Sequence, residues 1–483
     1  MTTAPEHLDV LIVGAGLSGI GAAHQIQANF PARSFAIFEA RDAIGGTWDL
    51  FRYPGVRSDS DMQTLGYRFR PWTDEKSIAD GPAILDYVRD TAREAGLDQR
   101  IRFGHKVIRA QWSTPDARWT VQASHGDEVV TVTCTFLYLC SGYYRYDEGF
   151  TPNFEGTDRF EGSIVHPQHW PEELDYTGKK VVIVGSGATA VTLVPAMSER
   201  AEHVTMLQRS PTYIAALPSR DPITNGLRRL LGDRLSYPIA RWKNVAFMTV
   251  TFQLSQRRPR LIKAVLRRAQ ERALPAGYDI DTHFTPRYNP WDQRMCLVPD
   301  GDLFRAIRHG EASIVTDRIV TFTEKGLALE SGRELEADVI VTATGLNLLA
   351  FGGIDLVVDG RTVSLPDTLA YKGMMLSDVP NFVFTIGYTN ASWTLKADLV
   401  SDYVCRLLAH MDDKGHAVCV PTNDDPTLTT RPLLDFAAGY VTRSIDEFPR
   451  AGSRSPWQLG MSYAHDVVTL RHGKIEDGAM RFG

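Results

Sequence analysis

The sequence predicts an α/β fold with two parallel-sheet domains, one inserted into the other. Two glycine fingerprints, at residues 14–19 and 185–190, each follow a short apolar strand and precede a helix, which is typical of Rossmann-like dinucleotide-binding domains. Two further apolar strands, 136–140 and 337–343, run into Ser-Gly and Thr-Gly, and we expect them to mark the entry and exit of the inserted domain.

This reading predicts the domain boundaries. A first domain, which would bind FAD, is expected to comprise residues 1–145 and 341–483. A second domain, which would bind NADPH, is expected over residues 146–340, with a helical insertion at about 221–285. At 483 residues the chain is long enough for each domain to bury its own core.

The first fingerprint lies between strand 9–13 and a helix that we expect over 20–27. Its three glycines allow a tight turn, close approach of the backbone to a pyrophosphate, and close packing of the helix on the sheet. The phosphates would lie at the helix N-terminus, where free N–H groups and the helix dipole favour an anion. Glu39 ends the next strand, where a carboxylate accepts hydrogen bonds from an unphosphorylated ribose. The predicted nucleotide contacts here are Gly14, Gly16, Gly19 and Glu39.

The second fingerprint follows strand 180–184, and the next strand, 203–207, leads into Gln208-Arg209-Ser210 instead of an acid. A guanidinium pairs bidentately with a 2′-phosphate, so this site is predicted to prefer NADPH over NADH. The alternative interpretation of both fingerprints is a nucleotide-free α/β fold, with Arg209 a solvated surface charge. The predicted contacts of the second nucleotide are Gly185, Gly187, Thr189, Ala190, Arg209 and Ser210.

The composition and the absence of certain motifs argue against several other classes of protein. The net charge of −6 gives no broad electrostatic footprint for nucleic acid. The five cysteines are scattered without C-x-x-C spacing, so we expect no disulfide framework, no zinc site, no disulfide reductase and a reducing cytoplasmic compartment. His166 and His169 have helical metal-ligand spacing, but Pro167 opposes a helix and no further ligand lies in register. No export signal, membrane span or G-x-S-x-G hydrolase motif is found.

Residues 225–272 form a basic amphipathic segment, with Leu and Val at helical spacing and only Asp233 and Glu271 as acids. One interpretation is a pair of helices lying at the periphery of a membrane. The other is a helical subdomain with a solvated basic face over the substrate cleft. The basic residues are Arg228, Arg229, Arg234, Arg241, Lys243, Arg257, Arg258, Arg260, Lys263, Arg267, Arg268 and Arg272.

Two longer motifs are more specific than the fingerprints. Residues 160–171 read F-x-G-x-x-x-H-x-x-x-W-P directly before the second fingerprint, and residues 45–59 read G-G-x-W…Y-P-G-x-x-x-D. With the stretches 289–294 and 388–396, they resemble class B flavoprotein monooxygenases of the Baeyer-Villiger type over nearly the whole chain. The resemblance is closest to the branch of mycobacterial ethionamide-activating enzymes, which oxidises ketones and sulfur compounds.

The resemblance implies an enzyme that uses NADPH and O₂ to convert ketones to esters or lactones and to oxidise thioethers and thioamides, through a C4a-peroxyflavin. An anionic peroxide needs a fixed cation beside it, and Arg294, held by Asp59, matches the catalytic pair of the family. NADP⁺ would remain bound and shield the site from water. The resemblance also assigns cofactor contacts to Gly46, Thr47, Trp48, Asp59, Val107 and Trp393.

Two alternatives remain open at this stage. An N- or S-oxygenating flavin monooxygenase would use the neutral hydroperoxyflavin and would depend less on Asp59 and Arg294. A non-catalytic flavin or NADPH sensor would bind a partner, although retention of that pair argues against it. One departure from the family pattern is Gln293, where a lysine often contacts the 2′-phosphate, so more of the NADPH preference would rest on Arg209 and Ser210.

Overall fold

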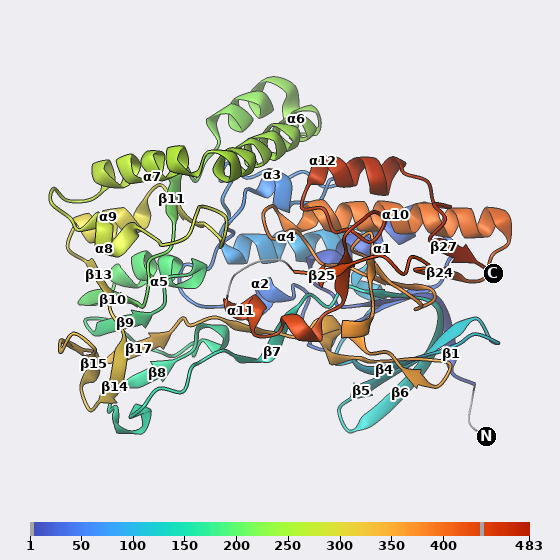
Figure 1. Ribbon diagram of the computed structural model, residues 1–483, viewed down its shortest axis with the longest axis horizontal. Helices are drawn as coiled ribbons and strands as arrows, with labels where there is room; N and C mark the ends of the chain where they lie inside the picture. Colours follow the sequence, from blue (N-terminus) through green and yellow to red (C-terminus); the bar gives the residue numbers. More distant parts are fainter. Residues whose placement is uncertain (1–3, 435–438) are drawn as a thin grey trace.

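The computed structural model describes residues 4–434 and 439–483 and contains two main sheets, which lie side by side in Figure 1. The first sheet is built around β1, whose residues 10–13 are apolar and buried and which pairs in parallel with β2 and β6. Such continuous apolar runs are typical of strands covered on both faces. The strands of this sheet are, in order, β20 (Arg361–Thr362), β19 (Asp355–Val358), β4 (Lys106–Ser113), β5 (Arg118–His125), β6 (Glu128–Leu139), β1 (Glu6–Val13), β2 (Phe35–Phe38) and β3 (Ile101–Arg102), with β23 (Phe382–Phe384) also paired to β6.

Two helices pack together on this sheet. The predicted helix 20–27 is confirmed as α1 (Leu17–Asn29), and α4 (Gly81–Glu94) packs against it. Pro82 fits the first turn of α4, because no N–H donor is needed there. The long helix α10 (Trp393–Lys414) returns from the C-terminal part of the chain and packs on α1.

The second sheet is entirely parallel. Its strands are, in order, β13 (Ala312–Thr316), β10 (His203–Gln208), β9 (Lys180–Val184), β17 (Val339–Thr342) and β8 (Ser163–Val165). The helices α5 (Ala188–Ser198) and α9 (Asp302–Arg308) pack together beside it, and a small antiparallel sheet adjoins it, made of β14 (Ile319–Thr323), β15 (Gly326–Leu329) and β16 (Glu334–Glu336).

The chain therefore leaves the first sheet, completes the second and returns, which agrees with the predicted insertion. The predicted boundary at 340 is wrong by a few residues, because it cuts β17, and the pairing of that strand with β8 and β9 extends to Thr342. The two connections pair with each other as β7 (Tyr144–Gly149) and β18 (Leu346–Leu348). His166 braces this crossing, since its Nε2 donates to the carbonyl oxygen of Gly345 (3.2 Å).

The basic segment is helical, as predicted, and forms α6 (Pro222–Arg257) and α7 (Pro259–Ala273), followed by α8 (Ile280–Phe284). Figure 1 shows α6 and α7 along one edge of the molecule, outside both sheets. α6 is broken at Gly232, where the backbone has a φ of 73°. It is fastened to the first domain by Arg241, whose Nη2 lies 2.7 Å from the carboxylate of Asp398 and whose Nη1 donates to the carbonyl oxygen of Gly66 (2.7 Å).

The remaining elements are short. β11 (Ile214–Leu217) pairs with β12 (Cys296–Pro299), β21 (Ala370–Tyr371) with β22 (Met375–Leu376), β24 (Cys419–Pro421) with β27 (Met480–Phe482), and β25 (Thr430–Pro432) with β26 (Arg450–Gly452). Short helices are α2 (Thr47–Leu50), α3 (Met62–Leu65), α11 (Gly439–Thr442) and α12 (Tyr463–Asp466). The five cysteines are buried and free, and over the described ranges no helix is long and apolar enough to span a bilayer.

Candidate active site

A cavity of about 1250 Å³ lies between the two sheets and reaches both glycine turns. It begins at the carboxyl ends of β1 and β9, where doubly wound folds bind their ligands. Its volume exceeds the ~300–1,000 Å³ that is usual for small-molecule pockets. The cavity is therefore large enough to hold more than one small molecule at the same time.

The first turn is shaped for a close approach of backbone. Gly14 has a φ of 104°, and a Cβ at this position would lie 2.6 Å from the carbonyl oxygen of Cys140. A Cβ on Gly19 would lie 1.8 Å from the carbonyl oxygen of Gly14, so only glycine lets α1 start against the strand. Gly16 lines the cavity and lies against Gly46, since a Cβ on Gly16 would be 3.6 Å from the Cα of Gly46. Gly19 itself does not line the cavity, and its role is to pack the helix.

Glu39 presents a buried carboxylate to the same space. Its Oε2 accepts the N–H of Ala15 (2.7 Å) and its Oε1 accepts the N–H of Arg41 (2.9 Å). Burial raises the pKa of Glu39, and the two backbone hydrogen bonds oppose that shift. Because each carboxylate oxygen has a second lone pair, Glu39 can still accept from a ligand hydroxyl.

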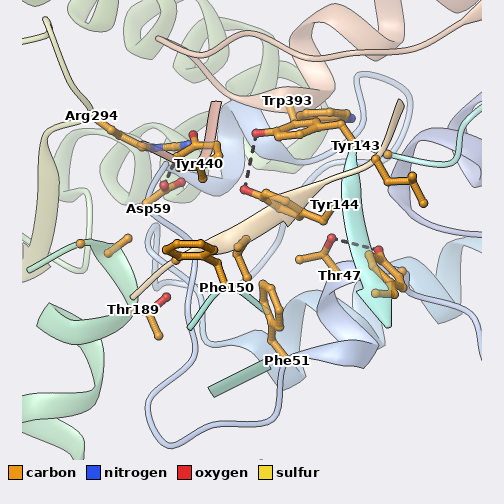
Figure 2. A pocket seen from close by; sticks show the side chains of 18 of the residues that line it. Thr47, Phe51, Asp59, Tyr143, Tyr144, Phe150, Thr189, Arg294, Trp393 and Tyr440 are labelled. Carbon is orange, nitrogen blue, oxygen red and sulfur yellow. Dashed lines mark hydrogen bonds and ion pairs between the residues drawn. The ribbon is translucent and has the colours of Figure 1, made fainter. Parts of the chain in front are cut away.

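The loop after β2 closes over this turn. Gly46 has a φ of 56° and precedes α2, and the Thr47 hydroxyl lies 3.2 Å from the Tyr146 hydroxyl (Figure 2). Trp48 and Val107 also line the cavity. On the opposite side, the indole nitrogen of Trp393 donates to the Ser18 hydroxyl at the start of α1 (2.7 Å). The predicted first-site residues other than Gly19 therefore meet around one space.

The second turn repeats the geometry of the first. Gly185 has a φ of 143°, and its Cβ would lie 2.3 Å from the carbonyl oxygen of Ala343, much as Gly14 meets Cys140. Gly187 lies at the N-cap of α5 with open space beside it. Ala190 is fully buried in the packing of α5 and does not reach the cavity, contrary to its predicted cofactor contact.

Arg209 and Ser210 line the cavity and are exposed, as a phosphate-binding pair requires. Among the described residues, no carboxylate lies within 4.0 Å of Arg209, so its charge is available to a ligand. Arg318 lines the same cavity and was missed in the sequence, because it follows β13 without any recognisable motif. Thr189 lines the cavity as well, as does Tyr53 of the first domain.

Arg294 and Asp59 both line the cavity and form an ion pair, which is drawn in Figure 2. The Arg294 Nη2 lies 2.5 Å from the Asp59 Oδ2, and the two side chains are 35% and 34% exposed. Burial disfavours the charged guanidinium, but Asp59 and the surrounding tyrosines raise the pKa of Arg294 above its ordinary value. The site therefore holds a permanent cation of fixed orientation.

Three tyrosines surround this cation and carry no sequence signal of their own. Tyr440, on α11, lines the cavity close enough to Arg294 to raise the pKa of the guanidinium, and Tyr143 lies 3.4 Å from Tyr144 between their hydroxyl oxygens. Burial raises the pKa of all three phenols, so each stays neutral. Tyr143 also stacks on Trp393, with ring centroids 5.1 Å apart.

The loop that carries Asp59 is anchored on the second domain. Gly55 has a φ of 75°, and a Cβ there would lie 2.7 Å from the Cβ of Ala196 on α5. Arg57 forms an ion pair with Asp302 of α9, and both side chains are largely buried. The Y-P-G-x-x-x-D motif therefore has two roles: it supplies the carboxylate of Asp59, and it connects the two domains.

Residues 8–362 match the sequence profile described as flavin-binding monooxygenase-like. The chain belongs to this family. The flavin-binding monooxygenase-like assignment agrees with the class of enzyme that the two long motifs resemble.

Full-length relatives in the family are known. The chain is 56% identical over 478 residues to the FAD-containing monooxygenase EthA of Mycobacterium tuberculosis strain H37Rv, covering 99% of this chain and 98% of that protein. It is 52% identical over 478 residues to EthA of Mycolicibacterium smegmatis, covering 99% and 97%.

Two solved structures share the fold. An oxidised steroid monooxygenase bound to NADP superposes with a TM-score of 0.78 at 22% identity and covers 99% of each chain. An open form of cyclohexanone monooxygenase gives a TM-score of 0.77 at 19% identity, covering 99% of this chain and 100% of that one. The fold, with its inserted second domain, is therefore that of Baeyer-Villiger monooxygenases.

Proposed function

We propose that this protein is an NADPH- and O₂-dependent flavin monooxygenase that inserts oxygen into ketones, giving esters or lactones, and oxidises sulfur compounds. The observation that carries the proposal is the Arg294–Asp59 ion pair, which lies in a cavity reached by both nucleotide turns. The full-length similarity to EthA supports the enzyme class.

FAD is proposed for the first turn and NADPH for the second. The Gly14 turn would take the pyrophosphate of FAD, and the carboxylate of Glu39 would accept a ribose hydroxyl. The Gly185 turn and the exposed Arg209 would take NADPH, because a guanidinium matches its 2′-phosphate. The bound pair would supply the reducing electrons and the activation of O₂.

The residues of the cavity have separate parts in this chemistry. Arg294 would stabilise negative charge that develops beside it, since its own charge cannot be lost. Asp59 fixes the plane of the guanidinium and keeps it aimed into the cavity. The neutral phenols around it add donors without competing for the cation. Figure 2 shows this group of side chains beside Phe51 and Phe150, whose apolar rings limit entry of water.

The test is product analysis with purified protein, NADPH and O₂. A simple cyclic ketone should give a lactone, and a thioether should give a sulfoxide, each detected by mass spectrometry. Arg294→Ala should lower lactone formation by at least about 100-fold, the usual loss for one oxyanion-stabilising donor. NADPH should still reduce the flavin of this variant anaerobically, because hydride transfer is a separate step.

Two results would contradict the proposal. Thioether oxidation without any ketone conversion, unchanged in Arg294→Ala, would indicate an oxygenating enzyme of the hydroperoxyflavin type. Purified protein that binds neither FAD nor NADPH would exclude both enzymes and favour a protein without redox activity.

A further inference from the structure

The helices α6 and α7 carry a surface that the proposed chemistry does not use. Among the described residues, sixteen large hydrophobic side chains are exposed, and eleven of them lie on these two helices. None of the described residues that line the active-site cavity comes from either helix. Contiguous exposed apolar surface of this kind marks an interaction site.

The exposed apolar side chains follow one side of α6. Their spacing, mostly three or four residues, puts them in one row along a helix of 3.6 residues per turn. The opposite side of α6 is the one that packs on the first domain, through Tyr237, Ala240, Arg241 and Asn244. The exposed row, called here the α6 stripe, consists of Leu235, Ile239, Trp242, Phe247, Val250 and Leu254.

Basic residues precede and follow the α6 stripe along the chain. Residues 225–272 hold twelve basic residues and two acidic ones, in a chain whose net charge is −6. Several of these bases are paired inside the protein, for example Arg241 with Asp398 and Lys243 with Asp221. Six exposed arginines have no carboxylate within 4.0 Å in the described part of the chain: Arg234, Arg257, Arg258, Arg260, Arg268 and Arg272.

We infer that α6 and α7 dock the protein on an anionic lipid bilayer, with the α6 stripe in the headgroup region and the unpaired arginines on lipid phosphates. Interfacial helices combine an apolar row of Trp, Phe and Leu with arginines and lysines in this way. The docked helices lie in the membrane plane, since among the described residues no helix can cross a membrane.

Charge favours a membrane over a second copy of this chain. A symmetric contact through the α6 stripe would bring the arginines of one copy toward those of the other, and like charges oppose such a contact. An anionic bilayer instead supplies a phosphate for each guanidinium. The buried Arg241–Asp398 ion pair holds α6 on the first domain, so the α6 stripe has a fixed position relative to that domain.

The experiment is flotation of the full-length, FAD-loaded protein with vesicles. We expect binding to vesicles that contain phosphatidylglycerol, little binding to vesicles of phosphatidylcholine alone, and weaker binding as NaCl is raised. The triple variant Arg257→Gln, Arg258→Gln, Arg260→Gln should bind on the order of 100-fold more weakly, because each basic residue contributes about fivefold. The flavin spectrum of each variant checks that it is folded.

A second variant tests the apolar part of the surface. Phe247→Glu with Val250→Glu should abolish vesicle binding, since two carboxylates would have to enter the headgroup region. Its matched control is Val129→Glu with Val320→Glu, which changes two valines of similar exposure (57% and 55%) on strands of the two domains. The charge control is Lys325→Gln, Arg333→Gln, Arg361→Gln, three exposed bases outside the helices. Both controls should bind like the unchanged protein.

Three outcomes would overturn the inference. The first is a folded protein that fails to float with phosphatidylglycerol vesicles. The second is binding that survives in both α6–α7 variants, because the docking face would then lie elsewhere. The third is self-association in sedimentation velocity that disappears in the Phe247→Glu, Val250→Glu variant while vesicle binding is absent, which would assign the α6 stripe to a second copy.

Discussion

Arg294 has two neighbours of different kinds in the cavity, the carboxylate of Asp59, with which it forms an ion pair, and the phenol of Tyr440. The carboxylate fixes the guanidinium, and both neighbours raise the pKa of Arg294. Sequence motifs indicated the ion pair. Nothing in the sequence indicated Tyr440, because it comes from another segment and has no motif around it.

Tyr440→Phe should lower kcat for the ketone by about 10-fold and leave KM for NADPH unchanged. The reason is that we expect the phenol oxygen to accept from the neighbouring guanidinium during turnover, and a hydrogen bond to a charged group is worth about 1.5–3 kcal/mol. Steady-state kinetics measures both constants. Tyr176→Phe removes a hydroxyl from the core of the second domain and serves as the control. An unchanged kcat in Tyr440→Phe would show that the phenol does not position Arg294.

Arg209→Ala should raise KM for NADPH by about 10- to 100-fold and leave KM for NADH nearly unchanged. Only NADPH carries the 2′-phosphate, and a hydrogen bond to a charged group is worth about 1.5–3 kcal/mol. Arg318→Ala is the matched variant, since Arg318 also lines the cavity. If Arg318→Ala raises KM for NADPH more than Arg209→Ala does, without a change in KM for NADH, Arg318 is the residue that binds the 2′-phosphate.

Among the elements, the strand–turn–helix units could be predicted because their signals are local. β1 and β9 are short apolar runs that lead into glycines, and the structure shows why glycine is needed, at Gly14 and Gly185. The strand at 337–343 was predicted, but the domain boundary was placed at 340, inside β17, because the pairing of this strand with β8 and β9 cannot be deduced from its own residues. The orientation of α6 could not be predicted either, since both of its sides carry apolar residues.

Gly19→Ala and Gly16→Ala should separate folding from cofactor binding at the first turn. A Cβ on Gly19 would lie 1.8 Å from a backbone oxygen, so this variant should lose thermal stability with or without FAD. A Cβ on Gly16 meets its nearest atom at 3.6 Å, so the apoprotein should keep its melting temperature while FAD binds at least about 10-fold more weakly. Melting curves of apo and FAD-loaded protein measure this. Equal losses in the two apoproteins would contradict it.

At the scale of the whole molecule, the two domains meet through the loop that supplies Asp59. Its anchor, the Arg57–Asp302 ion pair, could not be predicted, because its partners belong to different domains and neither stands in a ligand-binding pattern. The general arrangement, an inserted domain with a shared cavity, was predictable from the order of the motifs along the chain.

Arg57→Ala should increase the fraction of NADPH electrons that is lost as H₂O₂, because Asp59 and the second domain would no longer be held together. We expect a several-fold rise in H₂O₂ per NADPH consumed, measured with a peroxidase-coupled assay, and little change in flavin content. Lys180→Ala breaks an exposed ion pair with Glu336 and should have no effect. The same H₂O₂ yield from both variants would argue against the anchor.

The pairing of β23 with β6 has a consequence for the order of events during synthesis. Every strand of the second sheet has been synthesised once Thr342 is made, whereas the first sheet waits for Phe382–Phe384 and for α10, which packs on α1. Domains fold as units while the chain grows. The inserted domain can therefore finish folding while the halves of its host are still apart, and a nascent chain stopped between these points would contain a complete coenzyme domain beside an unfinished flavin domain.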